Sequence, residues 1–265
     1  MHFIVHPKYR VSIMPVVTNL PHSLLIYCIY ILLASQSLVS HANVIINSTR
    51  VIYPQNQHEV SVQLTNDSPQ PALIQAWIDS GDPDATFNQI SVPFILTPPI
   101  VRIEPQSGQT LRLTWTGGSL PQDRESVFWL NILDIPPKKT DSTDSNILQM
   151  AIRSRIKIFF RPPSLDEKGA TGAFQSLRWQ RASASPATIL TIYNPSGYFI
   201  NIASITIGHH GKEITSLNGE MIAPRGSAEF KFTHLPEKID NTALRYEIFN
   251  DYGSITTVKA DNNKK

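Results

Sequence analysis

Cysteine is almost absent from the chain. The one cysteine, Cys28, lies in an apolar run near the amino terminus. The rest of the chain therefore has no internal disulfide, which excludes the disulfide-stapled scaffolds of small secreted proteins. A chain of this length can instead be stabilised by burial of an apolar core, as one large domain or as two ordinary ones.

An excess of charge of one sign is also absent. The first 42 residues hold two of the 23 basic residues, Lys8 and Arg10, and none of the 21 acidic ones. Residues 43–265 are therefore neutral by formal count. A neutral chain lacks the basic surface through which proteins bind nucleic acid or anionic membranes broadly. We expect no nucleic-acid partner.

Motifs for catalysis are missing as well. The chain has no Gly-rich phosphate loop, no GxSxG turn and no HExxH helix. The histidines of residues 43–265 have no spacing typical of metal ligands; they are His58, His209, His210 and His234. Asp141 and Asp144 lie in KKTDSTDSN, a composition typical of a solvated turn. The sequence therefore predicts no enzyme, no cofactor and no metal site.

A short apolar run does stand near the amino terminus. SLLIYCIYILLAS, from Ser23 to Ser35, follows Lys8 and Arg10. It is shorter than the roughly 20 residues of a membrane span. LVSHA comes next, with small residues at Ser40 and Ala42. This layout predicts a secretory signal peptide, residues 1–42, cleaved after Ala42.

An uncleaved membrane anchor is the alternative interpretation of this run. The short run and the polar residues that follow it disfavour an anchor. Translation from Met14 instead of Met1 would also discard both cations of the segment. We therefore expect export across the inner membrane, with no membrane insertion after cleavage.

Short β-type runs separated by Pro, Asn, Asp and Gly clusters fill the rest of the chain, and helix signals are nearly absent. The runs in the first half are 44–53, 59–66, 72–79, 93–97, 109–116, 126–135 and 148–161. Seven strands over this length predict an immunoglobulin-like sandwich. We expect Trp77 in the third run and Trp115 in the fifth to fill its core.

A second series of β-type runs follows PPSLDEKGATG (162–172), whose prolines, charges and glycines predict a linker. These runs are 176–180, 188–194, 198–208, 227–233, 244–250 and 254–260, with HHGKE (209–213) as a hairpin tip. The predicted fold is all-β, with one sandwich domain over residues 43–162 and a second over residues 163–265.

The run NILQMAIRSRIKIFFRPP, from Asn146 to Pro163, is long for a strand, since strands usually have about 5–6 residues. Apolar residues on one face alternate with cations on the other. The simplest interpretation is a final sandwich strand with a solvated basic face. However, the run begins with Leu148, Met150 and Ile152 as an unprotected apolar edge, which invites strand addition by another chain.

Several of these segments resemble the PapD-like family of periplasmic chaperones of chaperone–usher pilus assembly. The most specific is LPQDRESVFWLNILDIPP (120–137), which agrees with the family signature almost position for position. SRIKIFFRP (154–162), TRVIYP (49–54) and TPPIVRIEP (97–105) also have counterparts, and YNPSGYFI, IAPRG and NDYGS match more weakly. The resemblance covers nearly all of residues 43–265.

The resemblance implies two immunoglobulin-like domains in a boomerang arrangement, and it implies a role for eight residues. Arg50 and Lys157 match a cleft pair that clamps the carboxylate at a pilus subunit's C-terminus. Leu148, Met150 and Ile152 match donor-strand residues that enter the subunit's hydrophobic groove. Glu125, Arg161 and Asp251 match an ionic network between the domains. Arg153 and Arg155 match no role and are expected to be solvated.

The implied partners are pilus subunits and an outer-membrane usher, in the periplasm. The short segment PPKKTDSTDS resembles the short-loop branch of the family, whereas the absence of a second-domain disulfide departs from many relatives. The apolar edge leaves open a dimer in which two copies cap each other.

Two other function classes remain open at this point. A pilus subunit or sugar-binding sandwich would need a donor extension or exposed aromatics, whereas Trp77, Trp115 and Trp129 lie in patterns suited to core packing. A metallo-sandwich enzyme is disfavoured by the scattered histidines.

Overall fold

The protein is described by a computed structural model at Tyr27 and at residues 44–85, 89–137, 150–181, 188–209, 211–233, 235, 239 and 244–260. The chain divides into two units, Met1–His41 and Ala42–Lys265, and only the second is described below. The predicted signal peptide, residues 1–42, lies outside the described residues apart from Tyr27.

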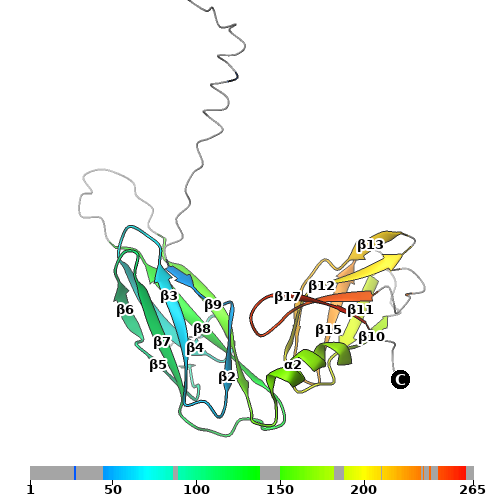
Figure 1. Cartoon of the computed structure of the whole chain (residues 1–265), viewed down its shortest axis with the longest axis horizontal. Helices are drawn as coiled ribbons and strands as arrows, with labels where there is room; N and C mark the ends of the chain where they lie inside the picture. Colours follow the sequence, from blue (N-terminus) through cyan, green and yellow to red (C-terminus); the bar gives the residue numbers. More distant parts are fainter. Residues whose placement is uncertain are drawn as a thin grey trace, which may run out of the picture. The chain divides into compact units, whose positions relative to one another are not determined.

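The first half of the second unit is a sandwich of two sheets (Figure 1). One sheet has the spatial order β1 (Val44–Ile46), β3 (Glu59–Asn66), β7 (Gly108–Trp115) and β5 (Phe94–Thr97). The other has the order β2 (Arg50–Pro54), β9 (Ile152–Arg161), β8 (Ser126–Ile135), β4 (Ala72–Asp79) and β6 (Ile100–Ile103). Strands β2 and β9 are parallel, and the other pairs are antiparallel.

Alternating apolar side chains from both sheets form the core of this sandwich. In β4 every second residue from Ala72 to Ile78 is buried, as period-two alternation requires. Tyr53 of β2 is fully buried, with its ring centroid 5.9 Å from that of Phe160 and 5.4 Å from that of Phe94. Its hydroxyl accepts the backbone N–H of Trp115 at 2.9 Å, so the polar end of the buried ring is satisfied.

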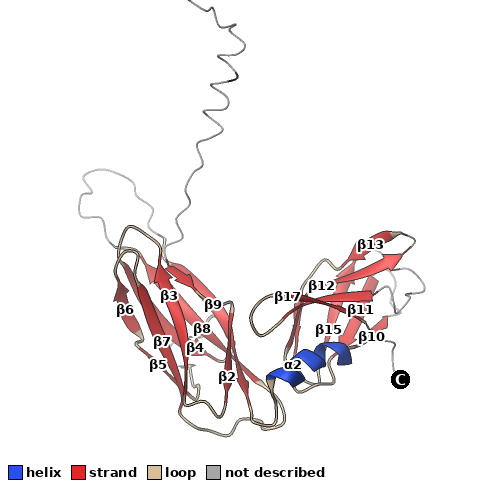
Figure 2. Cartoon of the chain, in the orientation of Figure 1, coloured by secondary structure: helices blue, strands red, loops and turns tan. Residues whose placement is uncertain are grey.

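The second half forms another sandwich with its own core (Figure 2). One sheet has the order β10 (Arg178–Arg181), β11 (Thr188–Tyr193) and β15 (Ser227–Phe232). The other has the order β13 (Lys212–Thr215), β12 (Ile200–His209), β16 (Leu244–Phe249) and β17 (Ile255–Lys259), with β14 (Glu220–Ile222) also paired to β12. The all-β fold with two immunoglobulin-like sandwiches is confirmed.

A short helix, α2 (Glu167–Ala173), stands where a linker was predicted, and a 3₁₀ turn, η2 (Phe174–Ser176), follows it. The Asp166 carboxylate caps the helix by accepting the N–H of Gly169 at 2.6 Å, and Ala170 and Ala173 are buried in the second core. Two glycines give the segment low helix propensity, so the cap and the burial decide its structure. No helix among the described residues is long and apolar enough to cross a membrane.

The predicted strand positions are mostly confirmed, with three kinds of error. The 72–79 and 126–135 runs match β4 and β8, and HHGKE is a hairpin tip, with His209 paired to Lys212. The single run 44–53 is wrong, because the chain leaves one sheet after β1 and joins the other at β2. Strands β6, β13 and β14 were not predicted. In the run 148–161, strand β9 begins at Ile152, and Met150 and Ala151, the described residues before it, are not in a strand.

Candidate functional site

Two cations lie next to each other on the outer face of β2 and β9. Arg50 and Lys157 are direct partners in the parallel ladder. The residues that follow them, Val51 and Ile158, are buried in the core, so strand alternation turns both cations outward. The structure therefore brings together the first pair of site residues that the sequence suggested.

The second sandwich contributes the other contacts of these cations. Arg50 Nη1 donates to the carbonyl oxygen of Phe249 at 3.3 Å, and its guanidinium lies 5.3 Å from the centroid of that ring. Lys157 Nζ donates to Asn201 Oδ1 at 2.7 Å and lies 5.4 Å from the centroid of Trp129. Asn201 and Phe249 are themselves partners across β12 and β16. The site thus combines residues of both sandwiches.

Burial disfavours the charged form of both Arg50 and Lys157. Burial lowers the pKa of Arg50, although the charge of Asp251 opposes the effect. Burial lowers the pKa of Lys157, and the positive charge of Arg50 lowers it further, against the attraction of Glu220. The Nε of Arg50 is buried and has no hydrogen-bond partner in the described structure. An anion bound here would therefore be stabilised by both charges.

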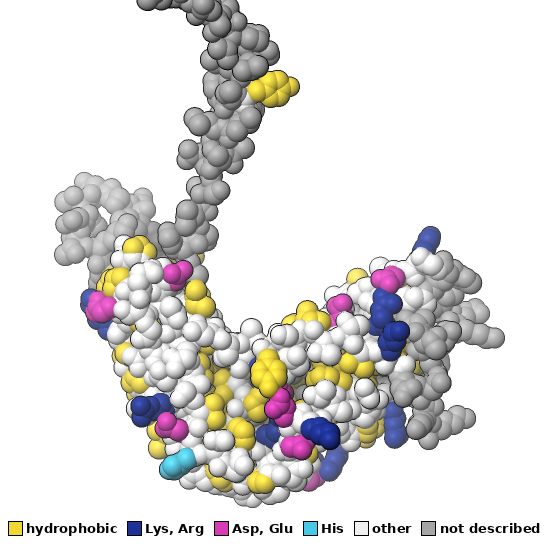
Figure 3. Space-filling model, in the orientation of Figure 1, with side chains coloured by type: hydrophobic (Ala, Val, Ile, Leu, Met, Phe, Trp, Pro, Cys, Tyr) yellow, Lys and Arg dark blue, Asp and Glu magenta, His cyan; other side chains and the backbone are white. Residues whose placement is uncertain are grey.

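A pocket of about 540 Å³ opens onto the two cations. It is lined by Arg50, Trp129, Lys157, Asn201, Ile202, Ala203, Gly219, Glu220, Met221 and Phe249. Arg50 offers a planar donor fork and Lys157 a point charge, which together suit a carboxylate. Elsewhere, on the face drawn in Figure 3, basic and acidic side chains are interspersed and form no extended patch of one sign.

Strand β9 has an open edge beside this pocket. Strand β8 pairs with it from Ile152 to Phe160, whereas β2 pairs only with its last five residues, Lys157–Arg161. The first half of β9 is therefore hydrogen-bonded on one side only among the described strands. Ile152 is 53% exposed and Met150, just before the strand, is 64% exposed. Leu148, the third predicted donor residue, lies outside the described residues.

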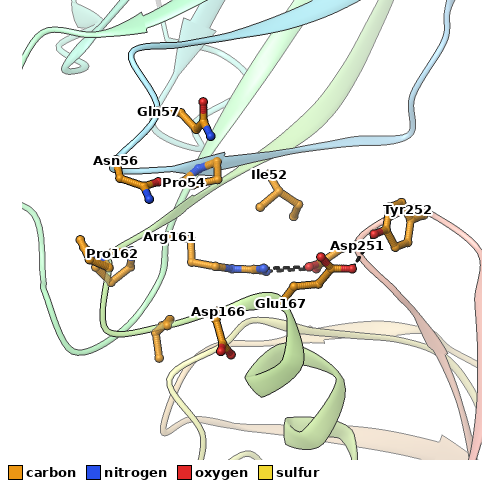
Figure 4. A pocket seen from close by; sticks show the side chains of 12 residues that line it. Ile52, Pro54, Asn56, Gln57, Arg161, Pro162, Asp166, Glu167, Asp251 and Tyr252 are labelled. Carbon is orange, nitrogen blue, oxygen red and sulfur yellow. Dashed lines mark hydrogen bonds and ion pairs between the residues drawn. The ribbon is translucent and has the colours of Figure 1, made fainter.

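Arg161, the last residue of β9, holds carboxylates from both halves of the unit. Figure 4 shows its contact with Asp251. Its Nε donates to Glu125 Oε1 at 2.7 Å, and its Nη1 and Nη2 donate to the two carboxylate oxygens of Asp251 at 2.8 and 3.1 Å. The second oxygen of Glu125 accepts the backbone N–H of Phe199 at 2.8 Å. The three residues proposed as an ionic network are thus in direct contact.

Charge and burial oppose each other in this network. Burial alone lowers the pKa of Arg161, but the carboxylates of Asp251 and Glu125 raise it above its usual value. Burial raises the pKa of Glu125, against the attraction of Arg161. Only 6% of the Arg161 side chain and 2% of the Glu125 side chain are exposed. Without Arg161, the Glu125 carboxylate would be a buried, uncompensated charge.

The prediction of solvated edge charges is wrong for Arg155, and for Arg153 it holds only in part, since that side chain is 34% exposed but has partners in the sheet. Arg155 Nη2 donates to Asp79 Oδ1 at 2.5 Å, and Arg153 donates through Nε and Nη2 to Asn131 Oδ1 at 3.0 and 2.7 Å. Asp79 and Asn131 are buried polar residues of β4 and β8, on the outer face of the sheet. Burial of these partners makes contact with the arginines favourable.

The core assignment of two tryptophans is wrong for a related reason. Trp77 and Trp129 lie on the outer face of the sheet, where the guanidinium groups of Arg153 and Arg155 cover their rings at 5.0 and 4.4 Å. Trp115 does pack against the core, with its ring 5.1 Å from that of Phe160. The sequence did hold one signal for this arrangement. Arg153 and Arg155 stand two residues apart, so both point to the same outer face of β9, where they can cover aromatic rings of neighbouring strands.

Asn201, Phe249 and Asp79 were not predicted from the sequence. The first two reach Arg50 and Lys157 only because the second sandwich packs beside them, which no local pattern reveals. Among the described residues, no three His, Cys, Asp or Glu side chains are grouped as a metal site.

Comparison with known proteins places this geometry in a family. Residues 43–166 match the family model for the N-terminal domain of PapD, described as a pili and flagellar-assembly chaperone, and residues 172–260 match the model for the C-terminal domain of the pili-assembly chaperone PapD. The chain is 38% identical over 233 residues to the chaperone protein FimB/FhaD of Bordetella pertussis, covering 86% of this chain and 92% of that protein.

Two solved structures are similar over most of their length. The YadV chaperone is 36% identical with a TM-score of 0.68, over 82% of this chain and 98% of YadV. The SafB chaperone, solved in complex with the SafA pilin of Salmonella enterica, is 25% identical with a TM-score of 0.67, over 83% of this chain and 95% of that chain. These relatives are named as chaperones, not as enzymes or pilus subunits. The chain belongs to the PapD family of periplasmic pilus-assembly chaperones.

Proposed function

We propose that this chaperone captures an unassembled fimbrial subunit by two linked contacts. Arg50 and Lys157 hold the subunit's C-terminal carboxylate, and the first half of β9 adds a strand to the subunit's incomplete sheet. The observation that carries the proposal is the adjacency of a partly desolvated cation pair, on β2 and β9, and the open edge of β9. A solved relative in complex with a pilin supports a subunit as the partner.

The clamp sets the register of the added strand. Once the carboxylate is anchored, the distance along β9 from Lys157 decides which side chain meets which part of the subunit's groove. Ile152, Met150 and Leu148 alternate from there, and a slip of one residue would turn all three away. Apolar side chains that are exposed in the free chaperone would become buried, which favours binding.

The same proposal includes delivery to an outer-membrane usher and export by a cleaved signal peptide, residues 1–42. It assigns residues 43–162 and 163–265 to two domains, with Glu125, Arg161 and Asp251 fixing their relative orientation. Determining the N-terminal sequence of the periplasmic protein tests the export step, since cleavage after Ala42 leaves Asn43 first.

Subunit capture is tested by a pull-down of tagged mature protein from the periplasm of its host. The wild-type chain is compared with Arg50→Ala, Lys157→Ala and the matched control Arg112→Ala, an exposed arginine on β7 in the opposite sheet. We expect a small β-rich fimbrial subunit, identified by mass spectrometry, with the wild type and the control and not with the clamp variants. Equal amounts of subunit on all four chains would refute the clamp.

A further inference from the structure

A buried carboxylate at the end of β4 organises the outer face of the sheet next to the open edge of β9. Only 2% of the Asp79 side chain is exposed. Its Oδ1 accepts the N–H of Gly81 at 2.7 Å and Nη2 of Arg155 at 2.5 Å, and its Oδ2 accepts Nδ2 of Asn131 at 2.7 Å. Arg153 Nη2 lies 3.7 Å from the same Oδ2. This carboxylate therefore accepts three hydrogen bonds and lies within ion-pair distance of a second arginine.

Asn131 of β8 extends the network to the start of β9. Its side-chain Nδ2 donates to Asp79, while its side-chain oxygen Oδ1 accepts two N–H groups of Arg153. The remaining Arg153 Nη1 donates to the carbonyl oxygen of Pro83, in the loop after β4, at 2.8 Å. Side chains alone thus connect β4, β8 and β9 across the sheet.

Two aromatic rings pack against the guanidinium groups of these arginines. The guanidinium of Arg153 lies 5.0 Å from the centroid of Trp77, and that of Arg155 lies 4.4 Å from the centroid of Trp129. The ring of Trp129 also faces Lys157 Nζ. Cation–π contacts of this kind add stabilisation to partly desolvated cations. The network therefore reaches the clamp lysine through a shared ring.

The anchored residues occupy the half of β9 that lacks a second neighbouring strand. Arg153 and Arg155 lie within Ile152–Ile156, which pairs with β8 alone, whereas Lys157–Arg161 lies between β8 and β2. A strand with one neighbour frays more easily than one with two. The charge network is concentrated where backbone pairing is weakest.

We propose that Asp79 is a positioning residue for subunit capture, because its buried carboxylate holds Arg153 and Arg155 and so keeps the free half of β9 extended and in register with Lys157. The inference rests on the proposed function in one respect: the extended segment is the one offered to the subunit. The order of that segment in the free chaperone does not depend on the subunit.

The first test measures hydrogen exchange of the free mature chaperone. In Asp79→Asn, which keeps the shape and removes the charge, we expect amides of Ile152–Ile156 that bond to β8 to exchange about tenfold faster or more, since hydrogen bonds to charged groups are among the stronger ones. Amides of Lys157–Arg161 and of β3 should keep their wild-type rates. Unchanged rates in Ile152–Ile156 would overturn the proposal.

A second variant removes the other partner of the contact. Arg155→Met keeps an aliphatic stem over Trp129 and loses the charge, and Arg112→Met is the matched control on the opposite sheet. The double variant Asp79→Asn/Arg155→Met should exchange more slowly than the sum of the two single effects predicts, because both changes remove the shared Asp79–Arg155 contact. Additive effects would show that Asp79 and Arg155 act separately, against the proposal.

Capture is then measured with the subunit identified in the pull-down. Asp79→Asn and Arg155→Met should bind it about tenfold more weakly, in proportion to the lost strand order, and Arg112→Met should bind as the wild type does. Weaker capture with wild-type exchange, or faster exchange with wild-type capture, would each reject the positioning role. If Arg50→Ala and Lys157→Ala still capture the subunit, the proposed carboxylate clamp is refuted. The exchange rates of β9 in Asp79→Asn still test the positioning role of Asp79, because they are measured on the free chaperone.

Discussion

Arg50 and Lys157 lie directly opposite each other in the parallel ladder of β2 and β9, so two like charges share one partly buried face. Like charges at opposed positions in a sheet are unfavourable. A chaperone that meets a carboxylate at this position gains a counter-ion for both. In the proposed clamp, the arrangement would trade stability of the free protein for affinity for the subunit's carboxylate.

Replacing Arg50 with methionine should therefore stabilise the free chaperone. Methionine keeps apolar contact with the ring of Phe249, and the change removes a desolvated charge whose Nε has no partner in the described structure. We expect the free energy of unfolding to rise by roughly 1 kcal/mol. Urea denaturation at neutral pH measures it. A less stable Arg50→Met protein would contradict the trade-off, provided that capture is lost as expected.

Lys157 should contribute a rise in the stability of the free chaperone with pH in the alkaline range, whereas burial raises the pKa of Tyr198 and of Tyr246, which therefore contribute a fall. The folded pKa of Lys157 lies below the 10.5 of the unfolded chain, because of burial and the charge of Arg50. Between these two pKa values the unfolded chain binds more protons at Lys157, so the contribution of this group to the free energy of unfolding rises with pH. The cost of the buried charge is fully present below the folded pKa and is relieved as the pH approaches 10.5.

Lys157→Met is the control for this pH dependence, since it should lose the alkaline rise attributable to this group. NMR titration of the Lys157 side chain gives its folded pKa directly. A midpoint at or above 10.5 would show that Asn201 and Glu220 outweigh burial.

Local alternation predicted β4 and β8 well, since each strand buries one face against a core and shows it in the sequence. The outer face of the same strands was predicted poorly. Trp77, Trp129 and Asp79 are covered there by arginines of β9, more than twenty residues further along the chain. The alternation pattern of one strand does not show which side chains of a neighbouring strand cover its outer face. For this reason the tryptophans were assigned to the core and the arginines to solvent.

The residues of the site that come from the first sandwich could be predicted, whereas those from the second could not. Arg50 and Lys157 were found through a family resemblance, whereas Asn201 and Phe249 come from a second sandwich whose packing no motif in the first encodes. Helix α2 was missed because an aspartate cap and buried alanines outweigh the low propensity of its glycines.

Removing Arg161 should destabilise the protein far more than removing one of its partners. In Arg161→Met the Glu125 carboxylate stays buried without its counter-ion. We expect the free energy of unfolding to fall by about 3–5 kcal/mol. In Asp251→Asn the arginine keeps its contact with Glu125, and the Asp251 side chain is 22% exposed in the wild type. We therefore expect the free energy of unfolding to fall by only roughly 1 kcal/mol. Urea denaturation compares the two. Adding Glu125→Gln to Arg161→Met should recover part of the loss, and no recovery would argue against an unpaired Glu125 as the cause.

Gly253 lies in the loop that carries Asp251, and its backbone has a φ of +83°. A Cβ there would lie 2.1 Å from Oγ1 of Thr49, the residue before Arg50. We expect Gly253→Ala to destabilise the protein by about 1–2 kcal/mol, since a left-handed conformation disfavours alanine. The collision with Thr49 should in addition displace Arg50 and weaken subunit capture.

The two effects of Gly253→Ala can be separated by a second change. Thr49→Ala removes the hydroxyl and leaves the backbone strain at residue 253, so the double variant should regain capture and remain less stable than the wild type. Binding and urea denaturation of the single and double variants together decide this. If capture stays weak in the double variant, the loop acts on the clamp through the position of Asp251 and its contact with Arg161, and not through contact with Thr49.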